Sequence, residues 1–200
     1  TRHLAALIRS SLRLITKKVI SSRDANLSFL TLLEESGQVY PPLALMHELG
    51  VLSRFLPEWA AVRSRPQRNA FHVYTVDRHL LQTVANANEL VRDVARPDLL
   101  LVGALLHDIG KGYPGDHTDR GVELVATMAD RMGFPADDVA VLVALVQHHL
   151  LLPETATRRD LSDPRTAANV AEAVGSPLTI ELLHALVEAD SKATGPSAWS

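Results

Sequence analysis

The stretch LLHDIGKG, residues 105–112, places a histidine and an aspartate, His107 and Asp108, directly after a run of apolar residues. An imidazole nitrogen and a carboxylate oxygen together suit a borderline or hard divalent ion such as Mn, Fe, Zn or Mg. A charged carboxylate that follows a buried run is costly unless it is paired or bound to a metal. We therefore expect this pair to face the interior of a helical fold and to need partner ligands from distant parts of the chain.

Two distant residues complete a candidate metal site. His72 lies in NAFHVYTVD, which opens a helix-like stretch, and Asp190 closes LLHALVEAD, another stretch with apolar residues at helical spacing. Three helices would then bring together four ligands, namely His72, His107, Asp108 and Asp190. We expect Mn²⁺ or Mg²⁺ as the ion, and Fe and Zn accept the same donors. The chain has no cysteine, so nitrogen and oxygen must supply every ligand.

Three further histidines are candidates for a second ion. His117 lies in GYPGDHTDRG, and His148 and His149 form a doublet in LVQHHLLLP. Adjacent helical residues point about 100° apart, so only one histidine of the doublet needs to face inward. We favour His148 and keep His149 as an alternative ligand or a substrate contact. One ion with spare histidines that contact phosphate remains the other interpretation.

Two charged residues near these ligands have open roles. Lys111 could contact a phosphate oxygen or lie on the surface, and Asp77 could orient a ligand imidazole or face solvent. The remaining histidines have no comparable sequence context and are expected to be structural or exposed; they are His3, His47, His79 and His184.

The periodicity of apolar residues predicts an all-α bundle whose facing helices carry the ligands inward. Proline and glycine mark the ends of many of these segments. The segment 57–69 is the expected linker or active-site rim, which divides the chain into an N-terminal helical segment, 1–56, and a catalytic domain, 57–200. The expected helices span about 4–20, 24–35, 41–50, 73–94, 98–108, 118–132, 136–151, 163–174 and 177–189.

The composition excludes several classes of protein. The hydrophobic fraction of 46% with only 4% aromatic residues favours helices over a sheet. Lysine and arginine number 20 against 23 acidic residues, so there is no electrostatic case for DNA or RNA binding. No apolar run of about 18–20 residues and no leader peptide stands out, so we expect a soluble, cytoplasmic chain with no membrane partner.

The histidine, the His-Asp doublet and the distal aspartate resemble the signature of the HD-domain metal-dependent phosphohydrolases. Longer phrases are similar to the HD domain of the bifunctional uridylyltransferase/uridylyl-removing enzymes of nitrogen signalling, over roughly residues 45–200. These phrases are RNAFHVYTVDRHLLQTV, LLVGALLHDIGKGYPGDHTDRG and ALVEADSKATGPSAWS.

This resemblance implies a hydrolase that removes UMP from a tyrosine of the uridylylated PII signal protein. It implies one or two divalent metal ions, with Asp108 bridging a pair, and catalytic roles for Asp108, Lys111 and His117. The nucleotidyltransferase and ACT domains of such enzymes would be partners in the same parent chain. Their motifs are absent here, so we expect a piece cut from a longer protein that carries removal and not transfer.

Two alternatives remain open at this stage. One is a generic HD phosphohydrolase that acts on a nucleotide, a cyclic dinucleotide or guanosine tetraphosphate. The other is a catalytically silent regulatory HD module that keeps a metal for stability or binds an effector. Metal content would not separate that module from an enzyme, whereas turnover would.

Overall fold

The computed structural model of the chain describes residues 2–35, 37–67 and 73–195, and within these ranges every regular element is a helix. The expectation of an all-α fold is therefore confirmed. Helices numbered α are α-helices and those numbered η are 3-10 helices. In chain order they are α1 (Arg2–Ser11), η1 (Leu12–Leu14), α2 (Lys17–Ile20), α3 (Arg23–Glu34), α4 (Tyr40–Leu49), α5 (Val51–Phe55), η2 (Pro57–Ala61), α6 (Val76–Asn88), α7 (Pro97–Leu106), η3 (Ile109–Gly112), α8 (His117–Met132), α9 (Ala136–His148), α10 (Leu151–Arg158), α11 (Pro164–Val174) and α12 (Pro177–Thr194).

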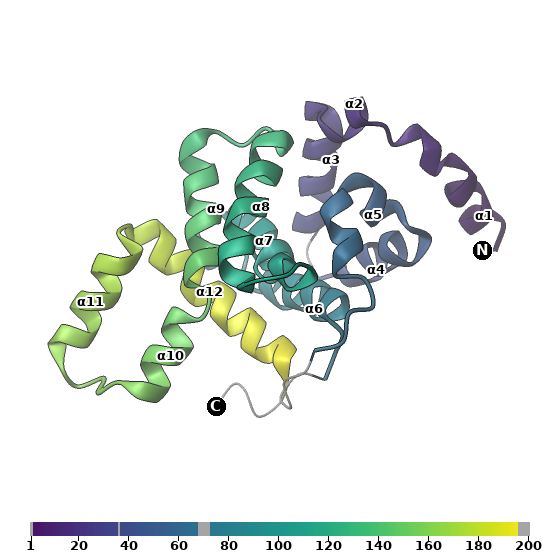
Figure 1. Ribbon diagram of the computed structural model, residues 1–200. Coiled ribbons are helices and arrows are strands. Elements are labelled where there is room, and N and C mark those ends of the chain that lie inside the picture. Colours follow the sequence, from purple (N-terminus) through teal and green to yellow (C-terminus); the bar gives the residue numbers. More distant parts are fainter. Residues whose placement is uncertain (1, 36, 68–72, 196–200) are drawn as a thin grey trace.

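Helix α7 is the centre of the bundle. Every residue from 99 to 106 is buried, and α3, α6, α9 and α12 all pack against this helix. Figure 1 shows α6, α7, α8, α9 and α12 gathered in the middle of the molecule. Because α7 is apolar all round, it can only be stable with neighbours on every side. The residues that follow it are therefore delivered to the interior of the protein.

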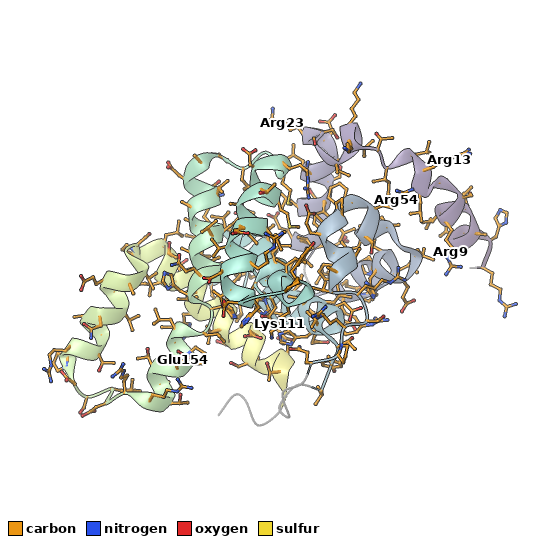
Figure 2. The ribbon with its side chains drawn as sticks, in the orientation of Figure 1. Arg9, Arg13, Arg23, Arg54, Lys111 and Glu154 are labelled. Atoms are coloured by element: carbon orange, nitrogen blue, oxygen red, sulfur yellow. The ribbon has the colours of Figure 1, made fainter. Side chains whose placement is uncertain are left out.

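The N-terminal segment is less regular than its sequence suggests. The single helix expected over about 4–20 is wrong, because the chain leaves the helical conformation at Ile15 and Thr16. The hydroxyls of Ser10 and Ser11 donate to the carbonyl oxygen of Leu7, which is the kind of local bond that competes with a continuing helix. Helix α1 has no buried residue. Figure 2 shows Arg9 and Arg13 on this outlying part of the molecule.

Residues on both sides of the expected boundary at 56/57 contribute to one hydrophobic core. Leu33, Leu43 and Leu52 from the N-terminal side are fully buried in the same cluster as Leu80 and Leu105. The region expected as a loop over 57–69 begins with a 3-10 helix, η2, that buries Trp59. The division into two segments stays a prediction.

Helices α10 and α11 extend away from the bundle (Figure 1). Helix α10 was not expected from the sequence. It has no buried residue, and α11 buries only Val174. By length and composition alone, the stretch Ala136–Arg158 could cross a membrane, and 22% of its most apolar window is buried. From the sequence we expected no apolar run of about 18–20 residues, and this stretch passes a test of helix length and mean hydropathy. The stretch is also part of the bundle, because α9 packs on α7, α8 and α12.

Candidate metal centre

The expected helix 98–108 included the His-Asp doublet, but in the structure the doublet lies just beyond the end of α7. His107 is the C-cap of α7, and Asp108 precedes the 3-10 helix η3. The turn is possible because Gly110 touches the next helix: a Cβ atom there would lie 1.9 Å from the carbonyl oxygen of His117. Glycine at this position brings the start of α8 against the doublet.

The first group of candidate ligands comprises His79, His107 and Asp190, whose donor atoms all lie within 4.8 Å of one another. The Nε2 atom of His79 lies 2.8 Å from Oδ1 of Asp190, and Nε2 of His107 lies 3.5 Å from the same oxygen. These residues come from α6, the end of α7 and α12. Both imidazoles are completely buried, so the interior of the bundle holds this group.

The second group comprises Asp108, His117 and His149, again within 4.8 Å. Oδ1 of Asp108 lies 4.0 Å from Nε2 of His117 and 3.7 Å from Nε2 of His149. The other oxygen, Oδ2, lies 3.8 Å from Nε2 of His79 and 3.6 Å from Nε2 of His107. Asp108 therefore presents one oxygen to each group, which is the arrangement a bridging carboxylate needs.

Backbone carbonyls orient two of the imidazole rings. Nδ1 of His107 lies 3.0 Å from the carbonyl oxygen of Ala104, and Nδ1 of His149 lies 2.7 Å from that of Val146. If Nδ1 carries the proton and donates it to the carbonyl, each Nε2 is left with its lone pair for a metal. The two anchors therefore aim both rings at Asp108.

The donor atoms fit a divalent cation. Within the described residues, Nε2 of His107 and Oδ1 of Asp108 are buried and have no hydrogen-bond partner. A buried polar atom without a partner destabilises the fold, unless a ligand supplies the missing interaction. Imidazole nitrogens and carboxylate oxygens are also the donors that Mn, Fe and Zn accept. The residues present therefore fit a metal ion.

Charges within the cluster shift its ionisation. Burial raises the pKa of Asp108, but the positive charges of His107 and Lys111 are the main effects that hold this pKa below its usual range. Burial likewise raises the pKa of Asp190, and His107 and His79 bring it well below the ordinary value. Both carboxylates are thus ionised at neutral pH, as metal ligands must be.

The pKa values of His107 and His149 shift in opposite directions. Burial lowers the pKa of His107, yet the neighbouring carboxylates of Asp108 and Asp190 reverse this effect and raise it overall. Burial lowers the pKa of His149, and the charge of Asp108 offsets this only in part. His149 is therefore neutral at pH 7, the state in which an imidazole binds a metal.

The structure brings together five of the sequence-predicted site residues in the two groups: His107, Asp108, His117, His149 and Asp190. Lys111 lies beside them, with its ammonium 2.5 Å from Oδ2 of Asp108. Asp190 lies inside α12 and not at the end of the helix, as the expected range 177–189 had placed it. His72 lies outside the described residues.

The preference for His148 over His149 is corrected. His149 points at Asp108 and is 2% exposed, whereas His148 is only half-buried and belongs to neither group. The hydrogen bond between the His149 ring and the carbonyl of Val146 fixes this choice. Burial lowers the pKa of His148 without any charged partner.

His79 is the residue that the sequence analysis missed. It was expected to be structural or exposed, yet it lies in the first group beside Asp190. Its spacing from Val76 and Thr83 could have indicated that His79 faces the core of the bundle, because residues three or four apart share a helix face.

Asp77 does not hydrogen-bond a histidine of either group in the described residues. Its Oδ2 accepts from the backbone N–H of Ser64 at 2.6 Å and lies 3.1 Å from Nε2 of His47, while Oδ1 accepts from the hydroxyl of Thr75. Burial raises the pKa of Asp77, but these hydrogen bonds bring it below the ordinary range. His47 is thus a buried structural residue, as expected.

A buried set of histidines and carboxylates that meets between the helices of an all-α bundle defines a class of metal-binding helical domains. The family model "HD domain" matches residues 76–186 of this chain. The chain belongs to the HD domain family. The match includes His79, His107, Asp108, His117 and His149, while His72 precedes it and Asp190 follows it.

Three similar relatives carry the name bifunctional uridylyltransferase/uridylyl-removing enzyme. The protein from Streptomyces coelicolor is 54% identical over 177 residues, which are 88% of this chain and 21% of the relative. That from Mycobacterium tuberculosis is 51% identical over 172 residues, 86% of this chain and 21% of the relative. That from Cereibacter sphaeroides is 35% identical over an alignment of 209 positions, which covers 97% of this chain and 22% of the relative. The chain thus spans about a fifth of the length of these proteins.

Proposed function

We propose that this domain hydrolyses the phosphodiester bond between UMP and a tyrosine of the uridylylated PII signal protein. The observation that carries this proposal is Asp108, which turns one oxygen to each of two buried groups of metal donors. The names of relatives up to 54% identical point to the uridylyl group. Uridylyl transfer, named in the same relatives, would reside in the remaining four-fifths of such a chain, together with its glutamine-sensing ACT domains.

The proposed ligands divide between two ions. His79, His107 and Asp190 would hold one ion, His117 and His149 would hold the other, and Asp108 would offer one carboxylate oxygen to each. Mn²⁺ or Mg²⁺ is the proposed metal, and Fe or Zn would suit the same donors. Bound divalent ions supply Lewis-acid polarisation of the phosphate and a lowered pKa for an attacking water.

The residues of the chain then bind and orient the diester. Lys111, which is partly exposed beside Asp108, contacts a non-bridging phosphate oxygen. His117 is 31% exposed at its side chain and marks the open side of the cluster, where the tyrosyl group leaves. Tyrosine has an unperturbed pKa near 10, so its phenolate leaves more readily than an alkoxide and places less demand on a general acid.

The test is UMP release from uridylylated PII by this chain in the presence of Mn²⁺. We expect release by the wild type and none by Asp108→Asn. Asp130→Asn is the matched control, because Asp130 is exposed on α8. Hydrolysis of small nucleotide diesters without release of UMP from PII would favour the generic phosphohydrolase. No turnover of either substrate by a folded, metal-bound chain would favour the silent module.

A further inference from the structure

Arg65 and Gln67, which follow η2, both contact η3 beside the metal centre. The guanidinium of Arg65 donates to the carbonyl oxygen of Gly112 at 3.2 Å, and the carbonyl of Arg65 accepts from the backbone N–H of Val76 at 2.8 Å. Gly112 touches the end of η2, since a Cβ atom there would lie 2.7 Å from the Cβ of Ala61. This packing carries the chain past Lys111 and delivers Gln67 to it.

Gln67 forms a polar contact with the side chain of Lys111. The Lys111 ammonium donates to Oε1 of Gln67 at 3.0 Å and to Oδ2 of Asp108 at 2.5 Å. Lysine has three N–H donors, so these two bonds leave one donor for another acceptor. Figure 2 shows Lys111 near the middle of the molecule, far from Arg9 and Arg13. The two acceptors together fix the position of this ammonium beside the cluster.

The amide oxygen of Gln67 has a hydrogen-bond partner, whereas among the described residues its amide nitrogen does not. Because Lys111 can only donate, it fixes the amide with Oε1 toward lysine and Nε2 away from it. Within the part of the chain that the structure describes, Nε2 is buried and has no hydrogen-bond partner. A buried donor of this kind is stabilised when a ligand brings an acceptor oxygen. The phosphate of a nucleotide offers several such oxygens.

We infer that Gln67 is a positioning residue for hydrolysis: its amide oxygen holds the Lys111 ammonium toward the phosphate, and its amide N–H₂ donates to the bound nucleotide. This inference rests on the proposed function, because it takes the nucleotide diester as the substrate. It adds a residue from the rim segment, which the search for metal ligands in the sequence did not single out.

The first test measures the contact without any turnover. The chain has lysines at positions 17, 18, 111 and 192 only, so acetic anhydride labelling followed by mass spectrometry resolves each position. In the metal-free chain, Gln67→Met should raise the acetylation rate of Lys111 at least about threefold relative to the other lysines, because it removes one acceptor. Gln67→Glu keeps an acceptor and adds a negative charge that stabilises the ammonium, so it should lower the rate below the wild-type value. Gln38→Met, at an exposed glutamine, is the control.

The second test uses uridine 5′-(4-nitrophenyl) phosphate, a small diester with a phenolate leaving group, with Mn²⁺ present. Gln67→Met should lower kcat/KM about tenfold, mainly through KM, because the phosphate is bound before the bond breaks. In a Lys111→Met background the same change should cost less than it does in the wild type, because the part of the loss that acts through Lys111 is gone and only the direct bond from the Gln67 amide to the phosphate remains.

The outcomes separate this inference from the proposed function. Unchanged Lys111 labelling in Gln67→Met, or additive losses in the double variant, would overturn the role of Gln67. Hydrolysis of the small diester without release of UMP from PII would overturn the proposed function. The comparison of the two single variants with the double variant would still test the role of Gln67. If neither substrate reacts, raised labelling of Lys111 would support the contact, and unchanged labelling would refute it.

Discussion

Asp108 is the residue on which both ligand groups depend. Its two oxygens lie between 3.6 and 4.0 Å from four imidazole nitrogens, and the side chain is almost completely buried. Without a cation, this carboxylate is balanced by Lys111 and the nearby histidines. A cation between each pair of donors would satisfy the buried atoms that lack partners.

His79 provides a first test at the residue scale. We expect His79→Ala to lower bound Mn²⁺ and to reduce UMP release more than about 100-fold, because one ligand of the buried group is lost. Metal content and UMP release measured on the same sample check this. His184→Ala is the control, since His184 is exposed on α12. Normal metal content and activity in His79→Ala would remove His79 from the site.

The histidine doublet provides a matched pair of variants. His149→Ala should reduce the metal stoichiometry from two ions toward one, whereas His148→Ala should leave it unchanged. The reason is that only the His149 ring faces Oδ1 of Asp108. Mass spectrometry of the metal-loaded chain under native conditions counts the ions. Two ions in His149→Ala would contradict the assignment of the second group.

At this scale the sequence predicted the chemistry better than the identity of every ligand. The doublet at 107–108 and the distal Asp190 could be found because each ends or follows an apolar run. His79 was overlooked because His72 offered a histidine in a more familiar phrase seven residues earlier. His79 shares the buried face of α6 with Val76 and Thr83, so its spacing pointed inward. Periodicity alone does not distinguish a buried metal ligand from a buried structural histidine.

At the scale of elements, the turn between α7 and α8 depends on Gly110. A Cβ atom there would lie 1.9 Å from the backbone of His117 and 2.7 Å from that of Gly121. Gly110→Ala should therefore lower the free energy of unfolding by about 3 kcal/mol, because backbone cannot move aside easily. Gly103→Ala should cost only about 1 kcal/mol, since its Cβ would meet the movable end of Leu145. Urea denaturation compares the two, and equal losses would contradict this packing.

An ion pair joins η2 to α8. The guanidinium of Arg131 makes two hydrogen bonds to the carboxylate of Glu58, at 2.7 and 2.8 Å. Burial raises the pKa of Glu58, but the bonds from Arg131 outweigh burial and hold this pKa below its ordinary value of 4.5.

The pair should therefore stabilise the fold above about pH 4.5 and lose this effect as the pH falls through the lower folded-state pKa. Arg131→Met should cost about 1–2 kcal/mol of unfolding free energy at pH 7 and progressively less in acid. Urea denaturation at several pH values measures the difference. A penalty that does not change between pH 7 and pH 3 would show that Arg131 acts through packing alone.

Helix positions were predictable where apolar spacing and capping agree. Helices α3, α8 and α11 begin within one residue of the expected positions, and each has a serine or aspartate that caps its N-terminus. The break at Ile15 and the extra helix α10 were not predictable. Both lie in segments with little burial, where no core contact reinforces the local signal.

At the scale of the whole molecule, the described bundle places donors from α6, α8, α12 and the C-terminal ends of α7 and α9 around one point. The all-α class follows from composition and periodicity. Which helices pack against one another does not, since that depends on contacts between residues as far apart as Asn86 and Ala189. The resemblance to a family predicted that the ligands meet, but not which helices pack together.

The most direct test of the central claim is a Mn²⁺ titration of UMP release from uridylylated PII, starting from the metal-stripped chain. We predict no release in the presence of a chelator, and release that rises with bound metal until two ions per chain are present. Asp108→Asn should remain inactive at every Mn²⁺ concentration. Release that persists without metal, or full release by Asp108→Asn, would contradict the assignment of this cluster as a metal-dependent hydrolytic centre.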